Sequence, residues 1–201
     1  MFIQAADLRK SLKYDPFKAI IAPRPIGWIS TISKNGVPNL APYSFFNAVG
    51  SDPNMLGFTS SGIKHTLINC QDTGEFVFNL VSADLVDAMN LTSAAIASDH
   101  NEFEFAKIGH TPSALVKPPR VANTPAAIEC KVTSIQRLKD LNGSDTNSWF
   151  VIGQVVGLYI AQGFVTSDNR FDTEKANITS RCGYMDYMRA GELFQLERPE
   201  I

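Results

Sequence analysis

The chain has 201 residues, a formal net charge of −2 and a pI of about 5.9. With 44% apolar and 19% charged residues, its composition is that of a globular protein and not of a disordered one. A chain of this length can bury a stable hydrophobic core without the help of disulfides or bound metals. We expect one domain over residues 1–201. The charge balance gives no basic footprint for nucleic acid, and no segment approaches the roughly 18 consecutive apolar residues of a membrane helix. Neither nucleic acid nor membrane is therefore expected as a partner.

The N-terminus lacks the charged start, apolar run and cleavage site of a signal peptide, so a cytoplasmic location is expected by default. The three cysteines, Cys70, Cys130 and Cys182, are odd in number and include no CxxC pair. Free, buried thiols are favoured over a disulfide framework or a zinc site. His100 and His110 do not have metal-ligand spacing, and no metal site is expected.

The first third of the chain predicts a lead-in followed by three strands. Residues 1–18 are expected to pack on the body of the protein, because Pro16 and Pro23 interrupt any continuous helix. Turns at Asn35-Gly36 and at 52–54 would separate the strands, which are expected over residues 26–33, 40–49 and 55–59. Prolines at 38 and 42 confine the second strand to a sheet edge or a bulge.

The middle of the chain predicts two helices around a buried strand. A helix over residues 64–72 is expected to end at Gly74, and the strand follows at 75–81. Ser82 is a good N-cap for the second helix, whose inner side would carry Leu85, Met89, Thr92 and Ile96. The charged segment SDHNEFE, residues 98–104, predicts a solvated face with a short helix.

Two long strands are expected over residues 127–138 and 149–161, joined by a polar hairpin loop. The tail from Ile178 is expected to be irregular with one short helical piece. Strands dominate, and the helices are inserted between them without regular alternation. This order predicts a mainly β fold, a small antiparallel β-barrel with helical insertions.

The loop over residues 57–66 comes close to the P-loop spacing, Gly-x4-Gly-Lys-Ser/Thr. One residue separates Gly62 from Lys64, and another separates Lys64 from Thr66. In a P-loop the lysine and the hydroxyl are adjacent because one reaches the terminal phosphates while the other holds magnesium. The extra residues misplace both groups, which argues against an NTPase.

The chemistry of this loop still suits a phosphate. Ser60, Ser61 and Thr66 offer hydroxyl groups, Lys64 offers a cation, and the start of the helix offers unpaired N–H donors. Together they fit a single dianionic phosphate without magnesium. The alternative is ordinary helix capping beside a solvated lysine.

The segment 39–47 mixes apolar, hydroxyl and amide residues without strict alternation, which is a poor pattern for a two-faced sheet. Pro42 would leave this strand partly unpaired, so that its peptide groups can face a ligand. Ser44 and Asn47 could form hydrogen bonds with a heterocycle or a polyol chain. The aromatic side chains could pack on a ring or an adjacent subunit, or they could simply be core residues: Tyr43, Phe45 and Phe46.

Several separated blocks resemble the flavin reductase-like family, which binds FMN. They are RPIGWIST, NLAPYSFFNAV, SDP, K-x-T, TGEFVFNLVSADLVDAMN, KPPRVANTPAAIECKV, FVIGQVVGLYI and the tail R-x-G-x3-Y-x-R at 181–189. The blocks occur in the right order over nearly the whole chain, which is more specific than any one of them. The resemblance implies an FMN-binding split barrel of Greek-key antiparallel strands. It also implies a homodimer with FMN in a groove between the subunits.

The resemblance further implies which residues contact the flavin. The phosphate would be held by Ser60, Ser61, Lys64 and Thr66, with His65 nearby. The isoalloxazine would be lined, largely through backbone groups, by Asn39, Pro42, Tyr43, Ser44 and Phe45. Asn47 would reach the ribityl chain, and Thr31 would approach from the neighbouring strand. Arg24 is a further candidate, with a salt bridge that locks the barrel as its alternative role.

The chain departs from the family pattern at three positions. His65 stands where family members often have Asp, which changes the charge near the phosphate. Asn54 replaces a second proline after Pro53. Tyr184 replaces a second glycine after Gly183, where its bulk could alter access to the flavin.

The implied function is that of an FMN-dependent oxidoreductase. NADH or NADPH would reduce the flavin, and the reduced flavin would serve a partner monooxygenase or another acceptor. No essential acid–base side chain is expected. No Gly-x-Gly-x-x-Gly follows a strand, so a Rossmann-type nicotinamide pocket is not indicated. Two alternatives stay open: an FMN-bound electron carrier without a nicotinamide site, and a non-flavin interaction module that keeps the barrel.

Overall fold

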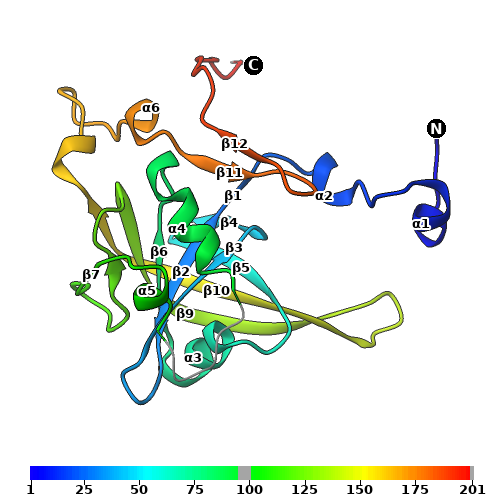
Figure 1. Ribbon diagram of the computed structural model, residues 1–201, viewed down its shortest axis with the longest axis horizontal. Coiled ribbons are helices and arrows are strands. Elements are labelled where there is room, and N and C mark those ends of the chain that lie inside the picture. The colour runs from blue at the N-terminus through cyan, green and yellow to red at the C-terminus, as the bar shows by residue number, and fades with distance from the viewer. Residues whose placement is uncertain (95–100, 200–201) are drawn as a thin grey trace.

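The computed structural model describes residues 1–94 and 101–199, and its central element is a seven-stranded sheet (Figure 1). Every neighbouring pair of strands is antiparallel, in the order β3-β2-β6-β9-β10-β5-β4. The prediction of a mainly β fold is confirmed. The strands are β2 (Gly27–Ile32), β3 (Pro38–Tyr43), β4 (Phe46–Ser51), β5 (Asn54–Ser61), β6 (Glu75–Asn79), β9 (Ala126–Lys139) and β10 (Asp145–Ile160).

The two edge strands of this sheet, β3 and β4, are consecutive in the chain and are separated by Ser44 and Phe45 alone. The prediction of one strand over residues 40–49 is therefore wrong. At Ser44 and Phe45 the chain passes from one edge of the sheet to the other. No local pattern of side chains predicts this change of edge. The edge position predicted from Pro42 is confirmed, since an edge strand tolerates a residue without an N–H.

Close contacts between the two ends of the sheet curl it into a barrel. Gly27 of β2 lies so near Phe46 of β4 that a Cβ on Gly27 would stand 2.5 Å from the phenyl ring. The rings of Tyr43 and Phe58 lie 4.8 Å apart between centroids. The glycine is required here because only a residue without a side chain allows this approach.

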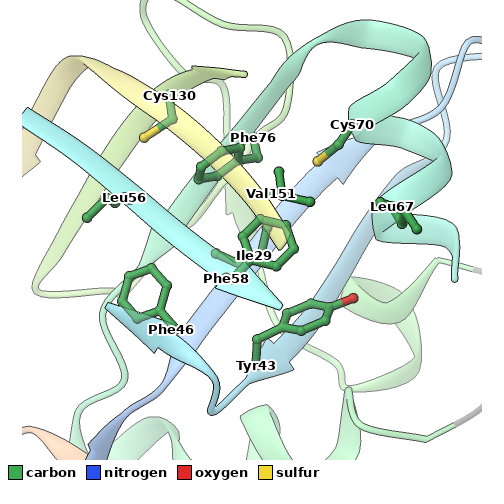
Figure 2. Close-up of a cluster of buried hydrophobic side chains, with 10 residues drawn as sticks. All are labelled: Ile29, Tyr43, Phe46, Leu56, Phe58, Leu67, Cys70, Phe76, Cys130 and Val151. Carbon is green, nitrogen blue, oxygen red and sulfur yellow. The ribbon is translucent and has the colours of Figure 1, made fainter. Parts of the chain in front are cut away.

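The core cluster inside the barrel is closed on one side by α3 (His65–Thr73), as Figure 2 shows. This helix ends at Gly74, as predicted, with φ +71°. Leu67 and Cys70 face the core, where burial raises the pKa of the Cys70 and Cys130 thiols to about 12. Thiols held neutral in this way are unreactive. The cluster consists of Ile29, Tyr43, Phe46, Leu56, Phe58, Leu67, Cys70, Phe76, Cys130 and Val151.

A second cluster lies around Trp28, whose indole N–H donates to Thr92 Oγ1 at 2.9 Å. Three short helical elements cover it: η2 (Ala83–Leu85), α4 (Val86–Leu91) and α5 (Glu102–Phe105). A two-stranded sheet stands beside them, formed by β7 (His110–Thr111) and β8 (Arg120–Val121). Of the predicted inner positions of the second helix, Leu85, Met89 and Thr92 are buried, and Ile96 lies outside the described residues. The histidine at position 100, which is considered only as a metal ligand, also lies outside them.

The short helix predicted within residues 98–104 is confirmed as α5, but of its two glutamates only Glu104 lies on the predicted solvated face. Glu102 and Phe103 are buried, with exposed fractions of 5% and 1%. Asn101 caps α5, because its side-chain oxygen accepts a hydrogen bond from the backbone N–H of Phe103. The cap turns the first residues of this helix inward in spite of their charge.

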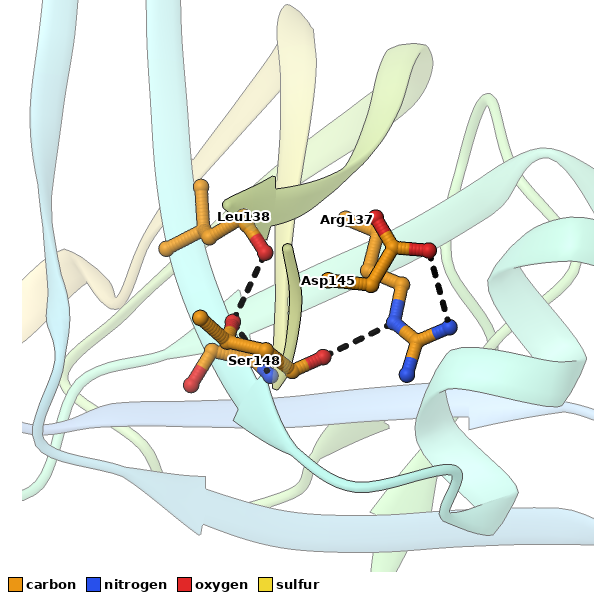
Figure 3. A network of polar contacts seen from close by, with 5 residues as sticks. Arg137, Leu138, Asp145 and Ser148 are labelled. Carbon is orange, nitrogen blue, oxygen red and sulfur yellow. Dashed lines mark hydrogen bonds and ion pairs between the residues drawn. The ribbon is translucent and has the colours of Figure 1, made fainter. Parts of the chain in front are cut away.

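The long hairpin of β9 and β10 extends beyond the rest of the barrel (Figure 1). Its outer part is held by the polar network in Figure 3. Arg137 Nε donates to the carbonyl of Thr146 at 2.8 Å, and its Nη1 lies 3.3 Å from the carboxylate of Asp145. Thr146 Oγ1 donates to the carbonyl of Leu138 at 2.8 Å.

The C-terminal tail runs along one side of the barrel, next to the segment that leads into β2 (Figure 1). There β1 (Arg24–Pro25), β11 (Thr179–Arg181) and β12 (Tyr187–Arg189) form a small sheet. The helical piece predicted in the tail is wrong, because Thr179–Arg181 pairs with β1 and Tyr187–Arg189 pairs with β11. Residues 190–199 form no regular element, which agrees with the predicted irregular tail. The remaining elements are η1 (Ala5–Asp7), α1 (Leu8–Ser11), α2 (Phe17–Ile20), η3 (Gln162–Phe164) and α6 (Thr173–Ala176).

The N-terminal segment does not pack on the body as expected. Figure 1 shows η1 and α1 extended away from the barrel, and neither buries any of its residues. Contacts at Tyr14 and in the region of α2 tie this segment to the rest of the fold. Among the described residues, no helix is long and apolar enough to span a membrane.

Candidate functional site

A cavity of about 590 Å³ lies between β3, the end of β5 and the start of α3. It brings together residues far apart in the sequence, including the end of α4 and Glu102 of α5. Nine of the twelve residues predicted to bind a cofactor line it. They are Asn39, Pro42, Tyr43, Ser44, Phe45, Ser61, Lys64, His65 and Thr66.

Thr31 lies behind the cavity wall as the centre of a buried hydrogen-bond network. Its Oγ1 accepts from Asn39 Nδ2 at 3.2 Å and from Asn69 Nδ2 at 3.0 Å. Asn39 Nδ2 also donates to Thr66 Oγ1 at 2.9 Å. The network ties β2, β3 and α3 together, so Thr31 supports lining residues without lining the cavity itself.

Ser60 and Asn47 are the other two predicted residues that do not line the cavity. Ser60 is buried, and its hydroxyl donates to the carbonyl of Gly62 at 2.9 Å, which shapes the loop before α3. Asn47 is exposed on β4, where its side-chain oxygen accepts from the backbone N–H of Ala48 at 2.8 Å. Both side chains are occupied with local backbone groups.

The start of α3 forms one end of the cavity. Lys64 is the N-cap residue, with extended backbone angles (φ −122°, ψ 167°), and no side chain caps the helix. The first N–H groups of the helix therefore have no partner from the helix itself. Ser61, Lys64, His65 and Thr66 surround these donors. Free N–H groups, a helix dipole and a lysine make this end suitable for an anion.

Tyr43 lines the cavity, and its side chain ends in a buried hydroxyl close to those of Thr66 and Ser60. Its hydroxyl is buried and has no hydrogen-bond partner among the described residues. Burial raises the pKa of Tyr43 to about 12, and the nearby Thr66 and Ser60 hydroxyls lower it by less. Figure 2 shows the hydroxyl pointing away from the apolar cluster. A neutral donor of this kind is normally paired when buried, so its state suggests a ligand with an acceptor atom.

Glu102 is a cavity residue that the sequence analysis missed. Its carboxylate is buried and accepts from the backbone N–H of Leu40 at 3.1 Å. Burial raises the pKa of Glu102, and hydrogen bonds from its own and the Leu40 backbone, together with the charge of His65, oppose that shift. It escaped notice because a charged run ordinarily predicts a solvent-facing helix.

The edge strand β3 forms the long wall of the cavity through Ala41, Pro42 and Tyr43. No strand pairs with its outer side, where Glu102 accepts from the Leu40 N–H and Pro42 has no N–H, so the groups left for a ligand are chiefly backbone carbonyls. Beyond the strand, the carbonyl of Phe45 accepts from the N–H of Thr59 at 2.8 Å, which fixes the turn around Ser44.

Arg24 does not line the cavity and forms no ion pair within the described residues. It is 7% exposed, and its guanidinium donates to three backbone carbonyls. Nη1 donates to Lys18 and Ile21, and Nη2 donates to Cys182 at 2.8 Å. It therefore locks the N-terminal arm and the tail to each other, through carbonyls and not through the expected salt bridge.

The three departures from the family pattern have different surroundings. His65 lines the cavity beside Glu102, whereas Asn54 is exposed at the start of β5. Tyr184 has φ +54°, a left-handed conformation that favours glycine. Its ring packs edge-on against Tyr14 at 5.9 Å and does not line the cavity.

With this geometry in place, comparison with known proteins defines the class. Residues 21–173 match the family described as flavin reductase like domain, and the chain belongs to that family. An uncharacterized protein of Halalkalibacterium halodurans is 32% identical over 206 residues, covering 100% of this chain and 98% of that protein.

Two solved structures have the same architecture. Nitrilotriacetate monooxygenase component B from Bacillus cereus superposes with a TM-score of 0.88 at 28% identity, covering 98% of each chain. A Shewanella frigidimarina protein with the split barrel domain of a flavin reductase gives a TM-score of 0.86 at 22% identity, covering 99% of this chain and 100% of that one. The predicted split-barrel fold is confirmed.

The described residues contain no group of three or more His, Cys, Asp or Glu side chains placed to hold a metal ion. The chemistry of the cavity is thus that of hydroxyls, amides, free peptide groups and a few charges. Such a donor set matches an organic ligand with a phosphate at one end.

Proposed function

We propose that the cavity binds FMN and that the protein is a flavin-dependent oxidoreductase. The observation that carries this proposal is the union of two features in one cavity. The uncapped start of α3, with Lys64 and Thr66, suits a phosphate, and the free edge of β3 suits a flat ring. Membership of the flavin reductase-like family and the unpaired Tyr43 hydroxyl support the same ligand.

The residues divide into two groups in this proposal. Ser61, Lys64 and Thr66 would hold the phosphate, together with the first N–H groups of α3. The peptide groups of residues 41–45 would hold the ring, and the Tyr43 hydroxyl would donate to the ligand. Bound FMN would supply a hydride-accepting ring, which amino-acid side chains lack.

The role of the chain is therefore to bind the flavin, to orient its ring and to shield it from water. The buried wall formed by Tyr43 excludes water from one side of the cavity, and the donors are already in place before the ligand arrives. Glu102 would keep a carboxyl group near the site, held by Leu40. No essential acid–base residue is assigned.

We further propose that NADH or NADPH is the electron donor and that a monooxygenase or another acceptor takes up the reducing equivalents. The similarity to a monooxygenase component B supports a partner of this kind. We also propose a cytoplasmic location and one domain over residues 1–201.

A homodimer is part of the proposal. Large apolar side chains on the arm and the tail are uncovered in the single chain, among them Phe2 (91% exposed), Phe194 (78%) and Leu196 (85%). Exposed apolar surface of this extent is typical of an interaction site. Size-exclusion chromatography with light scattering should give twice the chain mass of 22.0 kDa. A monomer at micromolar concentration would contradict this part of the proposal.

The oxidoreductase proposal is tested by absorbance under anaerobic conditions. Protein loaded with FMN is mixed with NADH and, separately, with NADPH. Loss of the oxidised flavin band at a rate well above that of free FMN is the expected result. If FMN binds but neither donor bleaches it, the protein is an electron carrier and the reductase proposal is wrong.

A further inference from the structure

Lys18 of α2 is a second cation of the cavity, and it comes from the lead-in segment that precedes the first of the family blocks. Its side chain lines the cavity together with Ser44 and Phe45. Its ammonium group lies 5.8 Å from the centre of the Phe45 ring. Lys18 therefore lies at the end where the strand edge opens, whereas Lys64 belongs to the start of α3.

Two independent contacts hold the backbone of Lys18 in place. The buried guanidinium of Arg24 donates to the carbonyl of Lys18 and also to that of Cys182 in the tail. On the same helix, Ala19 packs directly on Gly183, where an added Cβ would lie 2.6 Å from the Ala19 Cα atom. Figure 1 shows α2 beside β11 and β12 accordingly. An otherwise exposed arm is thus fixed at the one position that brings a lysine to the cavity.

The side chain of Lys18 is free to take a ligand. It is exposed, and within residues 1–94 and 101–199 it forms no ion pair with a carboxylate. Packing of an ammonium group on an exposed aromatic ring is a weak interaction, and a charge-assisted contact with a phosphate is stronger. The net charge of −2 gives no general attraction for anions, so any such attraction must be local.

We propose that Lys18 is the docking residue for the pyrophosphate of the reduced nicotinamide dinucleotide, with Arg24 and Gly183 as the residues that position it. This inference rests on the proposed function. Hydride transfer requires the nicotinamide to lie against the flavin ring, which is assigned to the wall formed by residues 41–45. The pyrophosphate is joined to the nicotinamide through one ribose, so it must lie just outside that wall. Lys18 lies over the ring of Phe45 at that place. It would bind the pyrophosphate there, as a glycine-rich loop does in a Rossmann domain.

The test measures binding as well as turnover. Lys18→Ala and Lys18→Glu are compared with Lys13→Ala, a matched control on the same arm whose ammonium lies 5.2 Å from the Tyr14 ring and which does not line the cavity. ADP-ribose, which carries the pyrophosphate without the nicotinamide, is titrated into each FMN-loaded protein by calorimetry. The FMN dissociation constant and the KM for NADH are measured in parallel.

We expect Lys18→Ala to weaken ADP-ribose binding and raise the KM about tenfold, Lys18→Glu to do so more strongly, and Lys13→Ala to change neither. FMN affinity should stay within about twofold in all three proteins, and added salt should weaken binding less in Lys18→Ala than in the parent. If the parent binds the dinucleotide and both Lys18 variants bind it equally well, this inference is wrong while the proposed function stands. If the parent binds no ADP-ribose and NADH reduces no flavin, the proposed reductase function fails, and this inference fails with it.

Discussion

The side-chain amide of Asn39 donates to Thr66 Oγ1 at 2.9 Å, joining the free edge of β3 to the start of α3. The two ends of the cavity are thus fixed relative to each other by a buried hydrogen bond between residues 27 positions apart. Thr31 supports the pair from behind, since its Oγ1 accepts from both Asn39 and Asn69.

Replacing Thr31 by Val should therefore destabilise the fold and, through it, the site. The buried amide of Asn69 loses this acceptor and that of Asn39 loses one of its two, which is expected to cost about 1–3 kcal/mol in the free energy of unfolding. Thr133→Val is the control, because that hydroxyl is exposed on β9 and donates to the carbonyl of Ile152. Urea denaturation followed by fluorescence measures both. Equal stability of the two variants would contradict the supporting role of Thr31.

Replacing Tyr43 by Phe separates stability from binding. The hydroxyl has no partner within the described residues, so its removal should leave the free energy of unfolding unchanged or slightly increased. FMN affinity should fall about five- to tenfold if the hydroxyl donates to the ligand as proposed. Fluorescence titration with FMN measures the affinity. Unchanged FMN binding would show that the hydroxyl does not face the ligand.

Replacing Glu102 by Gln should change how stability depends on pH. The pKa of Glu102 is raised in the folded state, so above pH 4 the unfolded chain gives up this proton first. The contribution of Glu102 to the free energy of unfolding is therefore largest below the pKa that this residue has in the unfolded chain. It falls as the pH rises toward the higher pKa that the residue has in the folded protein. The glutamine removes that loss and keeps an oxygen for the N–H of Leu40.

The measurement is urea denaturation of ligand-free protein between pH 4 and 8. Glu102→Gln should be the more stable protein near pH 7, with a flatter profile than the parent. The exposed Glu104 provides the control, and Glu104→Gln should leave the profile as it is. Parallel profiles for the parent and Glu102→Gln would rule out a raised pKa at this carboxyl.

Replacing Gly27 by Ala should strain the barrel where its two ends meet. The new methyl group would lie 2.5 Å from the ring of Phe46 and 2.9 Å from its Cβ, so the two strands must move apart. We expect a loss of about 1–3 kcal/mol. Gly109→Ala is the control, since its Cβ would meet nothing nearer than the Ala122 methyl at 3.5 Å. A melting temperature lowered equally in both variants would contradict the close approach.

The sequence predicted those parts of the fold that depend on local signals. The turn at Gly36, the helix that ends at Gly74 and the long strands of residues 126–160 all follow from side-chain patterns and turn residues. The passage from β3 to β4 did not, because a strand that changes sheet edges keeps an unbroken β pattern. The tail was missed because β11 pairs with Arg24 and Pro25 near the other end of the chain, and β12 then pairs with β11.

The site was predicted where the residue types carried the signal, as at Ser61, Lys64 and Thr66. Glu102 was missed because only tertiary packing buries it. Lys18 was missed because Arg24 holds its helix in place through backbone carbonyls, which leave no mark in the sequence. For Thr31 the family resemblance pointed to the correct neighbourhood, but the side chain supports the wall from behind.

The central claim is that the cavity holds FMN with its phosphate at the start of α3. The most direct measurement is a fluorescence titration of the parent protein and of Lys64→Ala/Thr66→Ala with FMN and with riboflavin, which lacks the phosphate. FMN should bind the parent at least about tenfold more tightly than riboflavin, and the double variant should lose that preference. Equal affinity of the parent for both ligands, or a preference for FMN that survives the double substitution, would contradict the claim.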